Sequence, residues 1–254
     1  MSLTQVRHLM AELCFNGMLG SIEETVAKVQ AGSLSFIEGI DFLCQSERHY
    51  RTKKAMQGRV SRSKIRKGAC LEEFDFTKSR QITKSQLKEL DTLHWCNEGR
   101  PLILIGPTGI GKTFLARALG LAACERGKTV LFTTVTEFLE HQAIARGAGT
   151  YLRFREKMVR PDLLILDDLG MRKFLTQEAE DLRDIVEQRS YGKSTLITTQ
   201  LPVEHWGEVI GDEIILDALV DRLEPPGIVL KLAGESYRKH LRKNKLVENS
   251  DQKQ

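Results

Sequence analysis

The stretch that decides the fold is "LILIGPTGIGKT", residues 102–113, in which four apolar residues lead into a glycine-rich turn ending in Lys-Thr. The turn fits the pattern GxxxxGK[ST], whose backbone N–H groups surround nucleotide phosphates in a strand–loop–helix unit. Lys112 is expected to reach the β- and γ-phosphates, and Thr113 to offer its hydroxyl to Mg²⁺. The helix expected after the turn adds the positive end of its dipole. A dinucleotide fingerprint is excluded because no third glycine follows Gly109 and Gly111 at the required place.

A second apolar run, "LLILDDLG" at 163–170, ends in two acids. Asp167 is expected to lie near Thr113 and the metal, and Asp168 to orient or activate the attacking water. Two acids that merely end a strand are the plain alternative, which the upstream phosphate loop disfavours. The residues expected to line the nucleotide site are Gly106, Pro107, Thr108, Gly109, Ile110, Gly111, Lys112, Thr113 and Phe114, with Mg²⁺ at Thr113 and Asp167.

A third apolar run, "STLITTQLP" at 194–202, ends in polar residues. Thr199 or Gln200 could reach the γ-phosphate from the carboxyl edge of the sheet. For each residue alone, a strand end that turns at Pro202 is nearly as good an interpretation.

Apolar runs alternate with helical patterns through the second half of the chain. The pattern predicts strands at 102–105, 129–133, 163–167, 194–198 and 227–231, and helices at 112–126, 136–146, 150–160, 177–191, 212–222 and 235–245. Strands that alternate with helices form parallel sheets covered on both faces, where strands read as continuous apolar runs. The expected fold is a three-layer α/β fold with a five-stranded parallel sheet, an N-terminal all-helical module and a short C-terminal helical region.

The first 55 or so residues predict three helices and no strand. Val6, Leu9, Met10, Leu13 and Leu19 fall on roughly one helical face within residues 4–19. "SIEE" at 21–24 and "SFIE" at 35–38 fit the capping-box pattern. "LEEFDF" at 71–76 marks a boundary, so the expected domains are 1–70 and 71–254.

The positive charge of the chain belongs to its N-terminal part. Residues 1–70 carry 11 Lys/Arg and 6 Asp/Glu, whereas residues 71–254 carry 27 and 28. The segment 48–68 holds nine Lys/Arg and no acid. A solvated helix face or flexible arm is the plain alternative, but a stripe of one sign repels itself and favours a polyanion. The residues proposed from this segment to contact DNA are Arg59, Arg62, Lys64, Arg66 and Lys67.

The composition is that of an ordinary globular protein, with 41% hydrophobic and 28% charged residues in 254. No apolar stretch approaches the roughly 20 residues of a membrane helix, and the N-terminus does not fit a signal peptide. The five cysteines lie far apart without a CxxC pair. They argue against a zinc site or a disulfide framework and are expected to be reduced, mostly buried thiols of a cytoplasmic protein.

The pieces in this order resemble the AAA+ ATPases of the initiator branch, and within it the IstB-like transposition helper proteins, which are related to the DnaC helicase loaders. The matching stretches are "FDF", "LILIGPTGIGKT", "LLILDDLG", "TTQLPVEHWGEVIGD", "ALVDRL" and "GESYRK", which span nearly all of residues 71–243. The resemblance implies an ATPase, with ATP and Mg²⁺, that assembles into a multimer on DNA. ATP would lie between neighbouring copies, and the assembly would recruit a cognate transposase.

The resemblance also implies roles for single residues. Arg222 falls at the arginine-finger position that reaches a neighbour's γ-phosphate, Arg238 at the second-sensor position, and Gln200 at the first-sensor position. Asp168 stands where many AAA+ proteins place Glu, although this branch does use Asp there.

The initiator branch carries an extra helix between its second and third strands that is used on DNA. The matching segment is 140–160, where Arg146, Arg153, Arg155 and Lys157 could line a DNA path. Solvated helix charge is an equally good interpretation of these residues.

Three alternatives to the transposition ATPase stay open at this point. A helicase loader would share the core and differ in the N-terminal module. A metabolic P-loop kinase would need an acceptor site and a lid, and would have no use for an all-basic arm. A DNA-binding scaffold with an inactive nucleotide site is the third.

Overall fold

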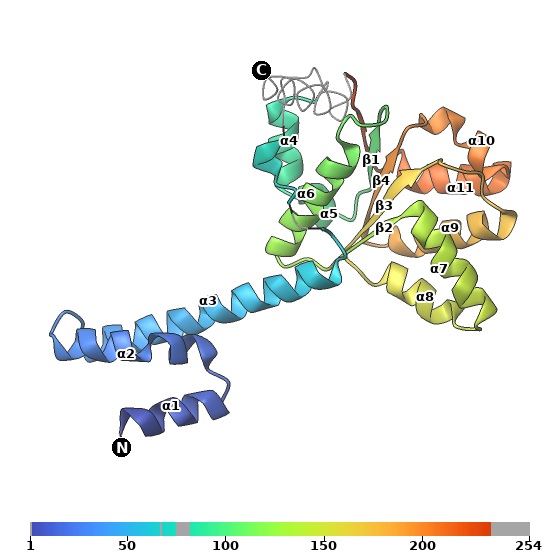
Figure 1. Ribbon diagram of the computed structural model, residues 1–254. Helices are drawn as coiled ribbons and strands as arrows, with labels where there is room; N and C mark the ends of the chain where they lie inside the picture. Colours follow the sequence, from blue (N-terminus) through green and yellow to red (C-terminus); the bar gives the residue numbers. More distant parts are fainter. Residues whose placement is uncertain (1, 67, 75–81, 235–254) are drawn as a thin grey trace, which may run out of the picture. The chain divides into compact units, whose positions relative to one another are not determined.

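The computed structural model describes residues 2–66, 68–74 and 82–234 (Figure 1). The predicted helix at 235–245, Arg238 and Lys67 lie outside the described residues. The chain divides into two compact units, Met1–Gly58 and Arg59–Gln254.

The N-terminal unit is helical, as predicted. Its elements are α1 (Leu3–Glu12), α2 (Asn16–Gln30) and α3 (Phe36–Arg62), the last of which runs past the division between the units. The predicted capping box at the start of α3 is confirmed, because Ser35 N donates to Glu38 Oε2 at 2.7 Å and Glu38 N donates to Ser35 Oγ at 3.3 Å. The predicted box at 21–24 is wrong, since Ser21 lies inside α2.

The apolar face predicted within residues 4–19 is divided between two helices. α1 ends at Glu12, and Cys14 has a φ of 58° that no helix interior tolerates. Leu9 and Leu13 are 49% and 54% exposed, so this face is not a buried core.

The start of α2 is held by an acid from α3. The Glu47 carboxylate accepts from Gly17 N at 2.6 Å and from Met18 N at 3.2 Å, and it pairs with Arg51. These bonds satisfy N–H groups that have no partner inside the helix. Gly17 is required here, because a Cβ would lie 2.5 Å from the Ser46 carbonyl oxygen.

The second unit begins at Arg59 and includes the described residues 59–66 and 68–70, so its start differs from the domain boundary predicted at 70. Phe132 N on the edge strand of the sheet donates to Ser63 O at 2.8 Å, and Arg59 Nε donates to Cys124 O at 2.8 Å. The Ile65 side chain is buried in the core of this unit. The end of the basic segment is thus fixed to the second unit by burial and hydrogen bonds, which composition alone does not reveal.

The sheet has the predicted class: five parallel strands in the order β2-β3-β4-β1-β5. The strands are β1 (Leu102–Ile105), β2 (Val130–Thr134), β3 (Leu163–Leu169), β4 (Ser194–Thr199) and β5 (Ile228–Lys231). All five predicted strands are present, and their bounds differ from the predicted ones by at most two residues.

The main helices of this unit also follow the prediction. They are α6 (Lys112–Glu125), α7 (Val135–Gly147), α8 (Tyr151–Val159), α9 (Thr176–Arg189) and α11 (Glu213–Leu223). The prediction missed the short elements η1 (Leu71–Glu73), α4 (Lys84–Asp91), α5 (His94–Asn97), η2 (Val203–His205) and α10 (Gly207–Ile210).

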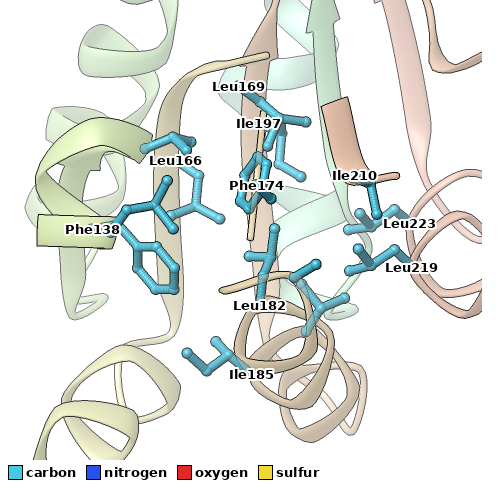
Figure 2. Close-up of a cluster of buried hydrophobic side chains, with 14 of the residues drawn as sticks. Phe138, Leu166, Leu169, Phe174, Leu182, Ile185, Ile197, Ile210, Leu219 and Leu223 are labelled. Carbon is cyan, nitrogen blue, oxygen red and sulfur yellow. The ribbon is translucent and has the colours of Figure 1, made fainter. Parts of the chain in front are cut away.

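Each face of the sheet is covered by its own apolar layer, because successive strand side chains point to opposite faces. Leu102, Leu104 and Ile165 pack with α4, α5 and α6. Ile103, Leu166 and Ile197 pack with the layer of α7 to α11. Figure 2 shows the second layer, in which side chains of α7, α9, α10 and α11 meet those of β3 and β4.

One buried arginine joins α9 by hydrogen bonds to the segment that leads into β3 and to the start of β4. Arg189, at the end of α9, is fully buried. Its Nη1 donates to the carbonyls of Met158, Val159 and Pro161 at 3.1, 3.0 and 2.8 Å. Its Nη2 donates to Ser194 O, and its Nε to Thr195 Oγ1. Burial lowers the pKa of Arg189 to about 9, which leaves the guanidinium charged at neutral pH.

Arg189→Met is therefore expected to lower the free energy of unfolding by about 3–5 kcal/mol, because the substitution leaves several buried carbonyl oxygens without donors. Urea denaturation measures this change. The control is Arg126→Met, which removes an exposed ion pair with Asp91 and is expected to cost at most about 1 kcal/mol. Equal losses for the two variants would contradict the bonding role given to Arg189.

The cysteines are free, as predicted, but only Cys96 and Cys124 are buried. The expectation of mostly buried thiols is wrong, because Cys14, Cys44 and Cys70 are exposed. A helix long and apolar enough to traverse a membrane does not occur in the described part of the chain.

Candidate nucleotide-binding site

The phosphate loop lies between β1 and α6, at the carboxyl edge of the sheet. Gly109 and Gly111 have φ values of 82° and 107°, which side chains with a Cβ rarely adopt. Gly106 passes so close to the chain after β5 that a Cβ would lie 2.3 Å from Leu232 O. Ile110 is buried and anchors the loop in the core. Gly109 and Gly111 thus serve the turn expected from the sequence, whereas Gly106 serves a close approach to Leu232 that the sequence did not indicate.

Lys112 begins α6 and is 5% exposed. Its Nζ donates to Gly106 O at 2.7 Å and to Pro107 O at 3.0 Å. The ammonium is therefore held over the loop itself, where it can meet phosphate oxygens. Phe114 follows in the same helix, and its ring lies 6.4 Å from that of Phe74, the first residue of "FDF".

The structure brings Asp167 and Thr113 together as predicted. Thr113 Oγ1 donates to Asp167 Oδ1 at 3.0 Å, and Thr198 Oγ1 donates to the same oxygen at 2.6 Å. Burial raises the pKa of Asp167, and the charge of Asp168 acts in the same direction. A bound cation would offset both effects, because it favours the charged carboxylate.

Asp168 follows at an irregular point of the strand. Its φ is 62°, and its backbone N donates to Thr198 Oγ1 at 2.9 Å. The pairing of β3 with β4 shifts register between Leu166 and Leu169. Asp167 and Asp168 therefore lie in a β-bulge, a feature that often stands beside active sites.

The structure separates the two polar residues at the end of β4. The Thr199 hydroxyl is buried and donates to Leu169 O at 2.9 Å. Gln200 is exposed, and its Oε1 accepts from Thr108 Oγ1 of the phosphate loop at 2.7 Å. Gln200 is therefore better placed than Thr199 for a sensor role.

The residues present fit a Mg²⁺ ion that is shared with a nucleotide. Mg²⁺ prefers oxygen ligands and is commonly held by one or two carboxylates together with substrate phosphates. Asp167 and Thr113 supply a carboxylate and a hydroxyl. Among the described residues, no group of three or more His, Cys, Asp or Glu could hold a metal ion. The ion would thus need the phosphate oxygens to complete its ligand set.

Arg222 lies on α11, in the layer on the other side of the sheet from α6. Its Nε donates to Glu187 Oε2 at 2.7 Å, and its Nη1 pairs with Asp221. Its side chain is 40% exposed. The described residues thus give Arg222 partners within its own chain, and the finger role remains a prediction.

The basic residues proposed to contact DNA divide into three groups. Arg62, Lys64 and Arg66 are exposed and form no ion pair among the residues that the structure describes. Arg59 bonds to Cys124 O and so has a structural role. In the hairpin of α7 and α8, Arg146 bonds to the buried Asp181, with Nε at 2.7 Å from Oδ2, whereas Arg153 is exposed and Arg155 half-buried.

The family model of the IstB-like ATP binding proteins matches residues 8–245 of this chain. The chain belongs to this family. The match includes both the phosphate loop and the two aspartates, so the protein is a P-loop ATPase of the AAA+ class. The metabolic-kinase alternative loses its support.

Two relatives of this chain are named as insertion-sequence proteins. The chain is 34% identical over 227 residues to a putative insertion sequence ATP-binding protein of Sinorhizobium fredii, covering 89% of this chain and 93% of the relative. It is 30% identical over 234 residues to a putative ATP-binding protein in an insertion sequence of Mycobacterium tuberculosis, covering 92% and 93%.

Two solved structures share the fold. The replication initiator DnaA bound to AMPPCP and single-stranded DNA superposes with a TM-score of 0.58 at 20% identity, covering 73% of this chain and 56% of that chain. The DnaC helicase loader gives a TM-score of 0.53 at 21% identity, covering 65% and 97%. At these identities the likeness shows the fold alone.

The residue-level prediction of the site missed Thr198. The available signal was a hydroxyl in a doubly covered apolar strand, since a buried polar group needs a hydrogen-bond partner. The pairing of Arg222 with Glu187 was also missed, because it joins residues 35 positions apart.

Proposed function

We propose that this ATPase binds DNA, assembles on it with ATP between neighbouring copies, and recruits and activates the transposase of an insertion sequence. The observation that carries the proposal is the joining of Lys112, Thr113 and Asp167 at one sheet edge in a family whose members are named as insertion-sequence proteins. Mg²⁺ and ATP are the proposed cofactors.

The proposed site divides the chemistry among its residues. The loop N–H groups and Lys112 would bind the phosphates, and Thr113 and Asp167 would hold Mg²⁺, which would offset charge on the β- and γ-phosphates. Asp168 orients the attacking water, and Gln200 senses the γ-phosphate. Arg222 of a neighbouring copy completes the site, and the second-sensor role is assigned to Arg238.

DNA is the proposed partner of the exposed basic residues at the end of α3 and in the segment that follows it. Arg62, Lys64 and Arg66 lie within five positions of one another and lack acidic partners in the described chain. Arg153 and Arg155 of the α7–α8 hairpin are a second candidate contact. Contacts to phosphates carry no sequence information by themselves. The proposed binding is therefore largely independent of sequence.

DNA affinity is expected to fall steeply with salt. If six or more phosphates are contacted, the affinity should drop roughly 10³-fold or more between 50 and 200 mM salt. Replacing Arg62, Lys64 and Arg66 together with Ala should weaken binding to every sequence about equally and reduce the slope of log affinity against log salt by about 2–3. Fluorescence anisotropy with several duplexes measures both quantities.

The matched control replaces Lys88, Arg126 and Lys173 with Ala, which removes the same charge from exposed positions elsewhere in the second unit. This control should keep the wild-type salt slope to within about one unit. A flat salt response of the wild type, or equal effects of the two triple variants, would sink the proposed DNA contact.

The helicase-loader alternative draws on the likeness to the DnaC fold. The two functions differ in the protein that is recruited. Co-purification of this chain on DNA with the transposase encoded beside it would support the proposed function, whereas capture of the replicative helicase in its place would support the alternative.

A further inference from the structure

The two aspartates of the site face a single residue of the neighbouring strand. The ladder pairs Leu166 with Ile197 and Leu169 with Thr199, so that three steps along β3 correspond to two along β4. Asp167 and Asp168 together take the place of one residue, and Thr198 alone lies opposite them. A bulge of this kind interrupts the ladder of backbone hydrogen bonds.

At this bulge the Thr198 hydroxyl both donates and accepts a hydrogen bond. It donates to Asp167 Oδ1 at 2.6 Å and accepts from Asp168 N at 2.9 Å. A hydroxyl has one proton to give and lone pairs to accept with, so one side chain can make both bonds at once. Thr198 is fully buried, where such bonds are costly to lose.

The second bond bears on an unusual backbone conformation. Asp168 has a φ of 62°, which few residues other than glycine adopt. Such a conformation persists only where the surroundings determine it. The bond from Asp168 N to Thr198 Oγ1 is one such restraint, and it acts on the residue assigned to the attacking water.

The first bond bears on the metal carboxylate. Thr113 and Thr198 both donate to Asp167 Oδ1. Thr113 is the hydroxyl that the phosphate-loop pattern assigns to Mg²⁺. If Thr113 instead offered its hydroxyl to a bound ion, the bond from Thr198 would still hold the Asp167 carboxylate.

We propose that Thr198 is a positioning residue that sets the metal carboxylate and the water-orienting carboxylate together through one hydroxyl. The proposal rests on the Mg²⁺ site at Thr113 and Asp167. In this proposal Thr198 acts only through its bonds to Asp167 and Asp168. Removal of its hydroxyl should therefore impair Mg²⁺ use and hydrolysis, and should leave the binding of the phosphates to the loop intact.

Thr198→Val tests this with nearly the same side-chain shape. Partners that orient metal ligands typically contribute about 10–100-fold to metal affinity or activity. The half-saturating Mg²⁺ concentration should rise by about that factor, measured as the Mg²⁺-dependent thermal shift of the ATP-loaded protein. The ATPase kcat should fall by a similar factor, while ATP affinity without Mg²⁺ stays within about 3-fold of wild type. Thr198→Ser, which keeps the hydroxyl, should restore both values.

Two further variants make the result decisive. Thr195→Val removes another buried hydroxyl of β4, which accepts from Arg189 Nε at 3.0 Å. It should lower stability without changing the Mg²⁺ requirement. Asp167→Asn removes the metal carboxylate itself, so it should raise the half-saturating Mg²⁺ concentration more than any other variant of this set. If Asp167→Asn leaves the Mg²⁺ requirement unchanged, the metal site itself is wrong.

Suppose that Asp167→Asn raises the Mg²⁺ requirement and Thr198→Val leaves it at the wild-type value. The metal site would then stand, and the positioning role of Thr198 would be overturned. The same holds if Thr195→Val and Thr198→Val raise the requirement equally. If the valine variant is too unstable to purify, Thr198→Ala carries the same expectations and the same contrary outcomes.

Discussion

Lys112→Ala is expected to lose ATP binding, with the dissociation constant raised about 100-fold or more. Lys112 is the one positive side chain among residues 106–113. Its Nζ also bonds to Gly106 O and Pro107 O, so the substitution removes both the phosphate ligand and a brace of the loop. Titration with a fluorescent ATP analogue measures the loss directly.

Lys193→Ala is the matched control for this experiment. Lys193 Nζ likewise donates to two backbone carbonyls, Val159 O at 2.9 Å and Arg160 O at 3.0 Å. The control therefore reports the effect of losing a lysine that braces the backbone. ATP binding by Lys112→Ala at near wild-type affinity, or equal losses in the two variants, would contradict the phosphate role.

Arg222→Ala is expected to bind ATP normally and to hydrolyse it about 10³–10⁵-fold more slowly. The reason is that its own loop is intact, whereas the neighbour's γ-phosphate loses a stabilising charge. The structure supplies the competing interpretation, in which Arg222 serves only the ion pair with Glu187. Steady-state ATPase assays on DNA, together with nucleotide titration, separate the two steps.

Glu187→Ala separates the two interpretations of Arg222. It removes the same ion pair but keeps the arginine. If Arg222 acts as a finger, Glu187→Ala should hydrolyse ATP within about 10-fold of wild type, because an exposed ion pair contributes at most about 1 kcal/mol. Matching defects in Arg222→Ala and Glu187→Ala would make the ion pair, and not the finger, the function of Arg222.

The phosphate loop could be predicted from the sequence because its requirements are local. Gly109 and Gly111 need positive φ values, and Lys112 and Thr113 must follow at once. The strands were likewise visible, since a strand covered on both faces is apolar throughout. These features depend on neighbours in the sequence and on little else.

Features that depend on tertiary contacts could not be predicted. The burial of Ile65 in the second unit moves the division of the chain to Gly58 and Arg59. Arg189 looks like an ordinary helix-end arginine until the carbonyls of α8 and β4 are placed around it. The bulge at Asp168 needs the register of two strands, which a single strand does not reveal.

The central claim is that ATP is hydrolysed between copies of this chain assembled on DNA. The most direct test mixes Arg222→Ala with Lys112→Ala, each inactive alone, and measures the ATPase rate with DNA present. Interfaces that pair the intact loop of one variant with the intact arginine of the other should restore about a quarter of the wild-type rate at equal, random mixing. A mixture that stays inactive, with both variants folded and bound to DNA, would contradict the claim.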